Sequence, residues 1–80
     1  MDPFMGLIRL LPYNFTPYGW LPCEGQILQI VQNTALFSLI GNKFGGNGTT
    51  NFALPDLRGF EAQPGARYFM ATMGYFPSRG

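Results

Sequence analysis

Few side chains in this sequence are suited to acid–base or nucleophilic chemistry. Asp56 and Glu24 form a candidate pair of carboxylates, and Cys23 is the single cysteine. The sequence contains no histidine, which removes the commonest general base, the usual partner of a Ser or Cys nucleophile and the usual zinc ligand. Cys23 has no cationic neighbour in the sequence to lower its pKa, so we interpret it as a small buried core residue. We therefore predict that the protein is not an enzyme and holds no cofactor or metal.

The same charged residues fit a structural role better. Asp56 follows Pro55 at a position where its short carboxylate can accept hydrogen bonds from backbone amides one or two residues further on. Arg58 is expected to pair with a carboxylate, either Asp56 or Glu24, within one subunit or between subunits. This interpretation predicts a fixed, charged turn instead of a catalytic dyad.

Two further patterns have a chemical and a structural interpretation. Residues 45–50, GGNGTT, look like a phosphate-binding loop, but that loop needs Gly-Lys-Ser/Thr at the start of a helix, and here a strand is expected to follow. A glycine-rich turn is the favoured interpretation. Asn14 and Asn47 each fit the Asn-x-Thr acceptor pattern for glycosylation, which matters only if the protein is exported to a compartment with that machinery. Asn47 is expected to be the better exposed of the two.

The charged turn is positioned by a strand that precedes it. Phe52 and Leu54 are two residues apart, which puts both side chains on one face of a strand. Pro55 lacks a backbone donor and ends the pairing, so the strand is predicted to stop at Leu54. Gly59 provides a position without Cβ where the chain bends sharply.

The other expected elements are one helix and several short strands. Their ranges are a first strand over 6–11, a short strand over 26–32, a helix over 34–40, a turn-rich connection over 42–50 and a last strand over 67–76. In the first strand, Arg9 is expected to face solvent. The last strand is apolar on both faces, so we expect a neighbouring subunit to cover it.

Two predictions concern packing. Trp20 is the largest apolar side chain and is expected to be the central packing residue. Apolar residues cover most of the circumference of the helix over 34–40, so this helix is expected to be buried nearly all round, with Asn33 or Thr34 capping its start and Gly41 providing its exit.

The composition indicates assembly. The chain has 80 residues, of which 46% are hydrophobic, 16% aromatic and only 11% charged, where about 25% charged is typical of soluble domains. A domain of this size buries only about 60 to 65% of the surface of its unfolded chain. More apolar material is present than one small subunit can hide, and extended exposed apolar surface usually marks an interface. We therefore predict obligate association with identical copies.

Charge and hydropathy exclude other partners. The net charge of +1 comes from five dispersed basic residues, without the cluster that a nucleic-acid backbone requires. No stretch approaches the ~20 apolar residues of a membrane span. The start of the sequence shows no basic and long apolar segments of a secretory signal peptide.

Several motifs, taken together, resemble a known family. They are MDPFMGLIR at 1–9, PYGWLPCEGQ at 17–26, LFSLIG at 36–41, FGGNG at 44–48, FALPDLRG at 52–59 and FMATMGYFPSR at 69–79. The chain resembles the phage tail collar domain, in the form carried by microcystin-dependent proteins, over nearly its whole length. There are two departures: Glu24 stands where the family usually has Asp, and only residues 60–65 remain of the long insert that usually follows Leu-Arg-Gly.

The resemblance implies a scaffold without the receptor-binding tip that the insert supports. It implies an α+β fold: one β-rich collar-type domain over residues 1–80, with one short buried helix, a closing C-terminal strand over 66–79 and intertwined oligomers. The residues expected to carry structure and assembly are Trp20, Glu24, Phe37, Phe52, Pro55, Asp56, Arg58, Tyr68, Phe69 and Phe76.

Two functions follow as expectations. The first is a structural, self-assembling subunit of a tail-fibre-like oligomer, either a homotrimer or an extracellular filament that grows by a repeated contact. The alternative is a tail-fibre or adhesin module that binds surface glycans through Trp20, Tyr13, Tyr18 and the 42–50 loop. In both cases we expect an extracellular or virion-associated protein.

Overall fold

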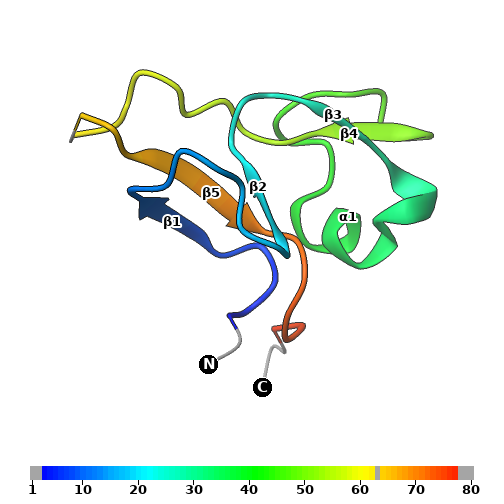
Figure 1. Cartoon of the computed structure of the whole chain (residues 1–80). Coiled ribbons are helices and arrows are strands. Elements are labelled where there is room, and N and C mark those ends of the chain that lie inside the picture. The colour runs from blue at the N-terminus through cyan, green and yellow to red at the C-terminus, as the bar shows by residue number, and fades with distance from the viewer. Residues whose placement is uncertain (1–2, 63, 78–80) are drawn as a thin grey trace.

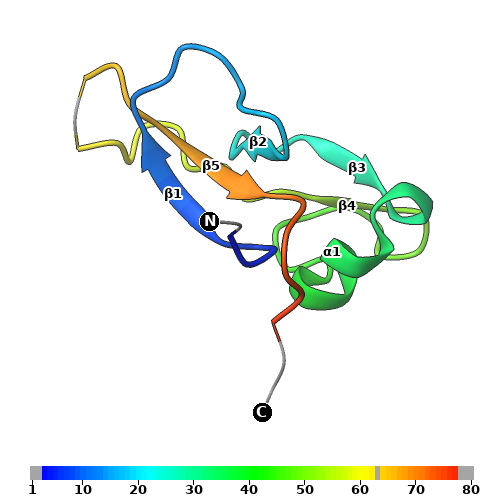
Figure 2. The same cartoon turned by 60° about the horizontal axis from the view of Figure 1, so that its bottom comes forward.

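The computed structural model describes residues 3–62 and 64–77. They form two small antiparallel sheets and one short helix (Figure 1). The elements are β1 (Ile8–Leu11), β2 (Trp20–Pro22), β3 (Ile27–Gln29), a 3-10 turn η1 (Ile30–Gln32), α1 (Thr34–Ile40), β4 (Asn51–Ala53) and β5 (Arg67–Ala71). Both views place the β3–β4 pair and α1 together beside the larger sheet (Figure 1 and Figure 2). The predicted mixed, β-rich class with one helix is confirmed.

The larger sheet has the order β1-β5-β2, so the last strand lies in its centre. β5 pairs with β1 from Ile8 opposite Met70 to Leu11 opposite Arg67, and with β2 from Trp20 opposite Ala71. Its residues Phe69, Met70 and Ala71 are buried. The prediction that a neighbouring subunit must cover this strand is therefore wrong: β1 and β2 flank it, and the chain itself buries both of its faces. The strand also ends at Ala71, five residues earlier than the predicted 67–76.

The smaller sheet consists of β3 and β4, and β4 is the strand predicted before the charged turn. Leu28 lies opposite Phe52, and the N–H of Leu54 donates to the carbonyl of Gln26 at 3.1 Å, so pairing continues past β4. Phe52 and Leu54 are completely buried, as their spacing predicts. The prediction that Pro55 ends the pairing is wrong: proline lacks only the donor, and its carbonyl accepts from the N–H of Gly25 at 3.2 Å, next to an isolated bridge between Glu24 and Asp56. The predicted strand over 26–32 is shorter than expected because the chain tightens into η1 at Ile30.

Helix α1 has the predicted bounds but not the predicted burial. Only Leu36 is buried, while Phe37, Leu39 and Ile40 remain partly exposed. A seven-residue helix on the rim of an 80-residue chain has too little protein around it to cover its whole circumference. No side chain caps its start, because the Asn33 amide donates instead to the carbonyl of Gln29 at 2.9 Å. Its end is as predicted: Gly41 has a φ of 59° and donates to the carbonyl of Phe37.

The core lies between the two sheets and the helix. Its buried cluster consists of Cys23, Leu36, Phe52, Leu54 and Met70. Trp20 is not part of it, so the prediction of a central packing role for this residue is wrong. It lies opposite Ala71, the last residue of β5, and therefore at the end of the sheet, where its indole is only partly buried.

The loop before β4 is held by the side chain of Asn47. Its Oδ1 accepts hydrogen bonds from the N–H groups of Thr49, Thr50 and Asn51 at 2.8 to 3.1 Å. The same loop lies directly against β4, since a Cβ added at Gly46 would be 2.5 Å from the Cα of Phe52. The glycine-rich sequence is therefore required by a close approach of two backbones.

Candidate functional site

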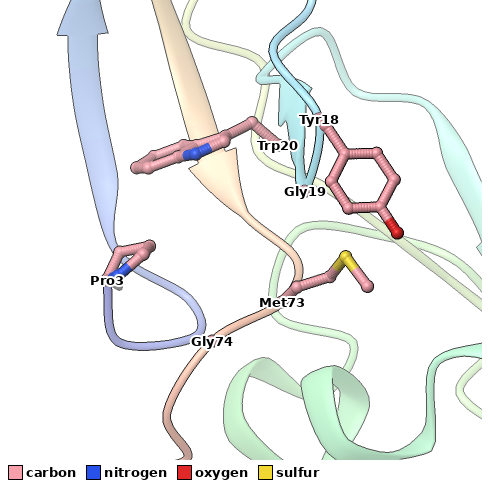
Figure 3. Close-up of a pocket in the computed structure, with 6 residues that line it drawn as sticks. All are labelled: Pro3, Tyr18, Gly19, Trp20, Met73 and Gly74. Atoms are coloured by element: carbon pink, nitrogen blue, oxygen red, sulfur yellow. The ribbon is translucent and has the colours of Figure 1, made fainter. Parts of the chain in front are cut away.

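A pocket opens where the first and last described segments of the chain meet at one end of the larger sheet. The N–H of Met5 donates to the carbonyl of Tyr75 at 2.7 Å, and the N–H of Tyr75 donates to the carbonyl of Pro3 at 3.0 Å. These bonds hold the segment after β5 beside the segment before β1. The pocket has a volume of about 320 Å³ and is lined by Pro3, Tyr18, Gly19, Trp20, Met73 and Gly74 (Figure 3).

The shape of the pocket depends on backbone conformations that favour glycine. Gly19 has a φ of 85° and Gly74 a φ of 118°. A Cβ added at Gly74 would overlap the carbonyl oxygen of Pro3, the acceptor for Tyr75. In Figure 3 the ring of Trp20 extends from Gly19 toward Pro3, while the ring of Tyr18 extends to the other side, near Met73. The glycines thus let two aromatic side chains diverge around one opening.

The pocket is suited to an apolar group. Among the described residues, no charged side chain lines it, and the polar groups of the lining side chains are the Tyr18 hydroxyl and the Trp20 indole N–H. Acid–base chemistry would need a titratable group with its pKa near the working pH, which this lining does not provide. An aromatic or aliphatic side chain is the natural occupant.

The predicted charged turn is present. Arg58 donates from Nε and Nη2 to the two carboxylate oxygens of Asp56 at 2.9 and 2.8 Å, and its backbone N–H donates to Asp56 Oδ1 at 3.2 Å. These hydrogen bonds lower the pKa of Asp56 to about 2, the contribution from the Arg58 side chain being the largest. Of the two partners predicted for Arg58, the structure selects Asp56. The pair is exposed, so salt and water screen it.

Glu24 and Asp56, the candidate pair of carboxylates, are each paired with a different arginine. Their backbones are adjacent through an isolated antiparallel bridge, but each carboxylate has its own arginine. Glu24 Oε2 is 3.9 Å from Nη1 of Arg67, while Asp56 holds Arg58. The two carboxylates therefore belong to two separate ion pairs.

Cys23 lies in the core, as predicted. Burial, and next the negative charge of Glu24, raise the pKa of its thiol to about 11. The thiol is therefore protonated at neutral pH and is a poor nucleophile. Its place in the buried cluster shows that it acts as a small apolar side chain.

Comparison with known proteins decides the family. The family model described as Phage Tail Collar Domain matches residues 6–61, well over half of the chain. The chain belongs to the phage tail collar domain family. No curated protein and no solved structure matches it. Membership gives this collar domain a structural role related to phage tail fibres and a virion-associated setting, and the family is not a known family of enzymes.

The collar domain match stops at Glu61, yet the sheet requires residues beyond it. β5 is the centre of the larger sheet, and Met73 and Gly74 line the pocket. Among the described residues, no helix is long and apolar enough to cross a membrane, and no group of His, Cys, Asp or Glu side chains is arranged to hold a metal ion.

The structure brings some of the predicted collar residues together and separates others. Phe37 and Phe52 pack with ring centroids 5.3 Å apart, and Phe69 lies under the guanidinium of Arg67 at 5.1 Å. Tyr68 packs against the core cluster from a partly buried position, whereas Phe76 is exposed.

Of the aromatic residues proposed as a glycan platform, only Tyr18 and Trp20 share the pocket. Tyr13 stacks on Phe15, with ring centroids 5.1 Å apart. The 42–50 loop is hydrogen-bonded to β4 and does not line the pocket.

Sequence reasoning missed three features of this collar domain. They are the loop-organising role of Asn47, the pocket contribution of Met73, and the need for glycine at position 74. Asn47 had a signal: an Asn before Gly-Thr-Thr is typical of a side chain that accepts from the next amides. No signal in the sequence indicated the roles of Met73 and Gly74, because the pocket exists only once two segments about 70 residues apart in the sequence lie side by side. Both Asn14 and Asn47 are exposed, and their glycosylation stays a prediction.

Proposed function

We propose that this collar domain is a structural subunit that assembles with identical copies into a tail-fibre-like oligomer or an extracellular filament. The observation that carries the proposal is its surface. A small domain has a high ratio of surface to volume, and in the described part of the chain many large apolar side chains lie on that surface.

The exposed surface is rich in apolar side chains. Twelve large hydrophobic side chains are exposed in the described part of the chain, against nine buried hydrophobic residues, three of which are alanines. The exposed set is Phe4, Ile8, Tyr13, Phe15, Tyr18, Ile27, Val31, Phe44, Phe60, Met73, Tyr75 and Phe76. Single exposed apolar residues are normal, but so many on so small a chain are typical of a surface that associates.

Covering these exposed apolar side chains in an interface would contribute substantially to the free energy of association. Phe4 and Tyr75 are 58% and 60% exposed and pack against each other with ring centroids 6.2 Å apart. Aromatic side chains bury 150–250 Å² each, so covering the exposed half of each ring contributes roughly 2 to 3 kcal/mol. A few such contacts offset the cost of association, which is at least about 4 kcal/mol.

One observation favours the alternative of glycan or receptor binding. Trp20 and Tyr18 line the same pocket, and aromatic faces suit the apolar faces of sugars. However, specific small-molecule sites also contain convergent polar groups, and this lining has only one hydroxyl and one indole N–H in its side chains. Assembly therefore remains the proposal that the geometry supports better.

The test is the state of the purified protein across a range of concentrations. Light scattering after size-exclusion chromatography should give masses above 8.9 kDa that rise with concentration, and negative-stain micrographs should show rods or fibres. A single 8.9 kDa species at every concentration would refute the proposal. A glycan array probed with the assembled protein addresses the alternative, which requires saturable binding that Trp20→Ala abolishes.

A further inference from the structure

Two apolar features lie at opposite ends of the larger sheet. β1 runs from Ile8, opposite Met70, to Leu11, opposite Arg67. The pocket lies at the first end, next to the Trp20–Ala71 pair, and the Tyr13–Phe15 pair follows Leu11 at the second end. The four residues of β1 separate the two ends by about 10 Å. Figure 1 shows the chain leaving β1 at the end of the sheet away from the first and last described segments.

The Tyr13–Phe15 pair is a projecting, ordered group. The two rings are stacked at an interplanar angle of 18°, and Phe15 is 59% exposed. The guanidinium of Arg67 donates to the carbonyl of Tyr13 from Nη2 at 3.3 Å and from Nε at 3.4 Å, which ties the loop to the first residue of β5. A group that is already held in place loses less conformational entropy when it binds.

The pocket at the other end matches this group in size and chemistry. Its volume of about 320 Å³ is at the lower limit of compact ligand sites, enough for an aromatic side chain. Tyr18, on its rim, is 90% exposed, so one ring of the pocket is left with almost no contact in the isolated chain. The described residues that line the pocket carry no charge, and the guanidinium of Arg67 beside the Tyr13–Phe15 pair already has partners in the Tyr13 carbonyl and Glu24.

We propose that Phe15, stacked on Tyr13 in one copy, inserts into the pocket formed by Pro3, Tyr18, Trp20 and Met73 of the next copy. This inference rests on the proposed function and names its contact. The occupant is a second copy because both features belong to the same chain, are apolar, and lie at opposite ends of one sheet. Large apolar side chains exposed in such number on a small chain are also typical of a surface that associates.

The arrangement of the two features sets the form of the assembly. A contact between two different patches of identical chains is heterologous, and it grows into an open filament when the rotation between neighbours does not close a ring. One subunit can use both ends at once because the sheet separates them. The structure thus favours a filament or ring over a two-fold dimer.

The test uses one variant at each end and one control. Phe15→Ser removes the projecting ring, and Met73→Asp puts a charge into the pocket; both positions are exposed, so the fold should survive. Each variant alone should assemble at least tenfold more weakly than the unmodified protein in analytical ultracentrifugation. Val31→Ser removes a side chain that is 81% exposed and belongs to neither end, so it should assemble normally.

A mixture of the two variants is the decisive measurement. Phe15→Ser keeps an intact pocket and Met73→Asp keeps an intact ring pair, so an equimolar mixture should form 1:1 heterodimers that do not grow. Circular dichroism must show that each variant is folded. If Met73→Asp is unfolded, Tyr18→Ser takes its place.

The outcomes separate the contact from the function. If the unmodified protein never assembles, the proposed function fails and this inference fails with it. If it assembles and both folded variants assemble as Val31→Ser does, this contact is refuted while the proposed function stands. If both variants are monomeric but their mixture forms no heterodimer, the head-to-tail arrangement is refuted.

Discussion

Gly74→Ala should destabilise the fold by separating the two segments that form the pocket and by straining the backbone at position 74. The added Cβ would overlap the carbonyl oxygen of Pro3, so the two terminal segments must separate. The two hydrogen bonds between Tyr75 and the segment of Pro3 and Met5 are then lost, at about 1 kcal/mol each, and the Phe4–Tyr75 ring contact contributes about 1 kcal/mol more. Backbone strain at a positive φ adds about 1 to 3 kcal/mol.

Gly59→Ala is the matched control for that strain. Gly59 also has a positive φ, 91°, but a Cβ there would meet nothing within 4 Å. The difference between the two variants isolates the separation of the segments, and we expect Gly74→Ala to be the less stable by about 3 kcal/mol. For a domain of this size, 1 kcal/mol shifts the Tm by about 4 to 8 °C, so the difference is easily measured.

Two assays check the reasoning. Urea unfolding, at a concentration where the protein is a single species, gives the free energies, and amide hydrogen exchange reports on the Met5 and Tyr75 N–H groups individually. Equal stability of the two alanine variants, with both amides still protected in Gly74→Ala, would show that the close approach of Gly74 to Pro3 does not hold the pocket together.

Three further outcomes are expected. Arg58 lowers the pKa of Asp56 to about 2, so the stabilisation from this pair should be complete above the unfolded pKa of about 3.9 and lost as the pH falls through about 2. NMR titration of the Asp56 carboxyl carbon measures this pKa, and Arg58→Ala should return it toward its ordinary value. The pKa of Cys23 is raised to about 11, so the stabilisation from its neutral thiol should be present below about pH 9 and lost as the pH rises through 11. At pH 8 the thiol should react with a disulfide reagent at least tenfold more slowly in the folded protein than in urea. Asn47→Ala should destabilise the protein by about 1 to 3 kcal/mol, because three backbone amides lose their acceptor. Asn47→Asp keeps an acceptor oxygen and should retain most of the stability in the same urea unfolding experiment.

Local patterns predicted the local structure well. The spacing of Phe52 and Leu54 placed a buried strand correctly, because period-2 burial acts within a few residues. Pro55 did not end the pairing as predicted, because its carbonyl still accepts from the N–H of Gly25. The Asp56–Arg58 turn and the bounds of the helix were predicted for the same reason.

Predictions that depended on distant parts of the chain were less accurate. Trp20 was expected at the centre because it is large, but its position opposite the last residue of β5 puts it at the end of the sheet. The last strand was expected to need an outside cover, but pairing with β1 and β2 puts it in the middle. Register and strand order decide both points, and no local signal in this sequence specifies them.

The central place of β5 has a consequence for how the protein is made. β5 follows β1 and β2 in the sequence but lies between them, and its partners in β1 are 56 to 62 residues away. While the ribosome is still adding residues 67–71, the first two strands have nothing to pair with, so their apolar side chains stay accessible to chaperones and to other nascent chains. Such distant pairing is slow because a long loop must close before any contact forms. The yield of correctly folded subunits in a cell should therefore depend on what shields residues 8–22 until synthesis reaches Ala71.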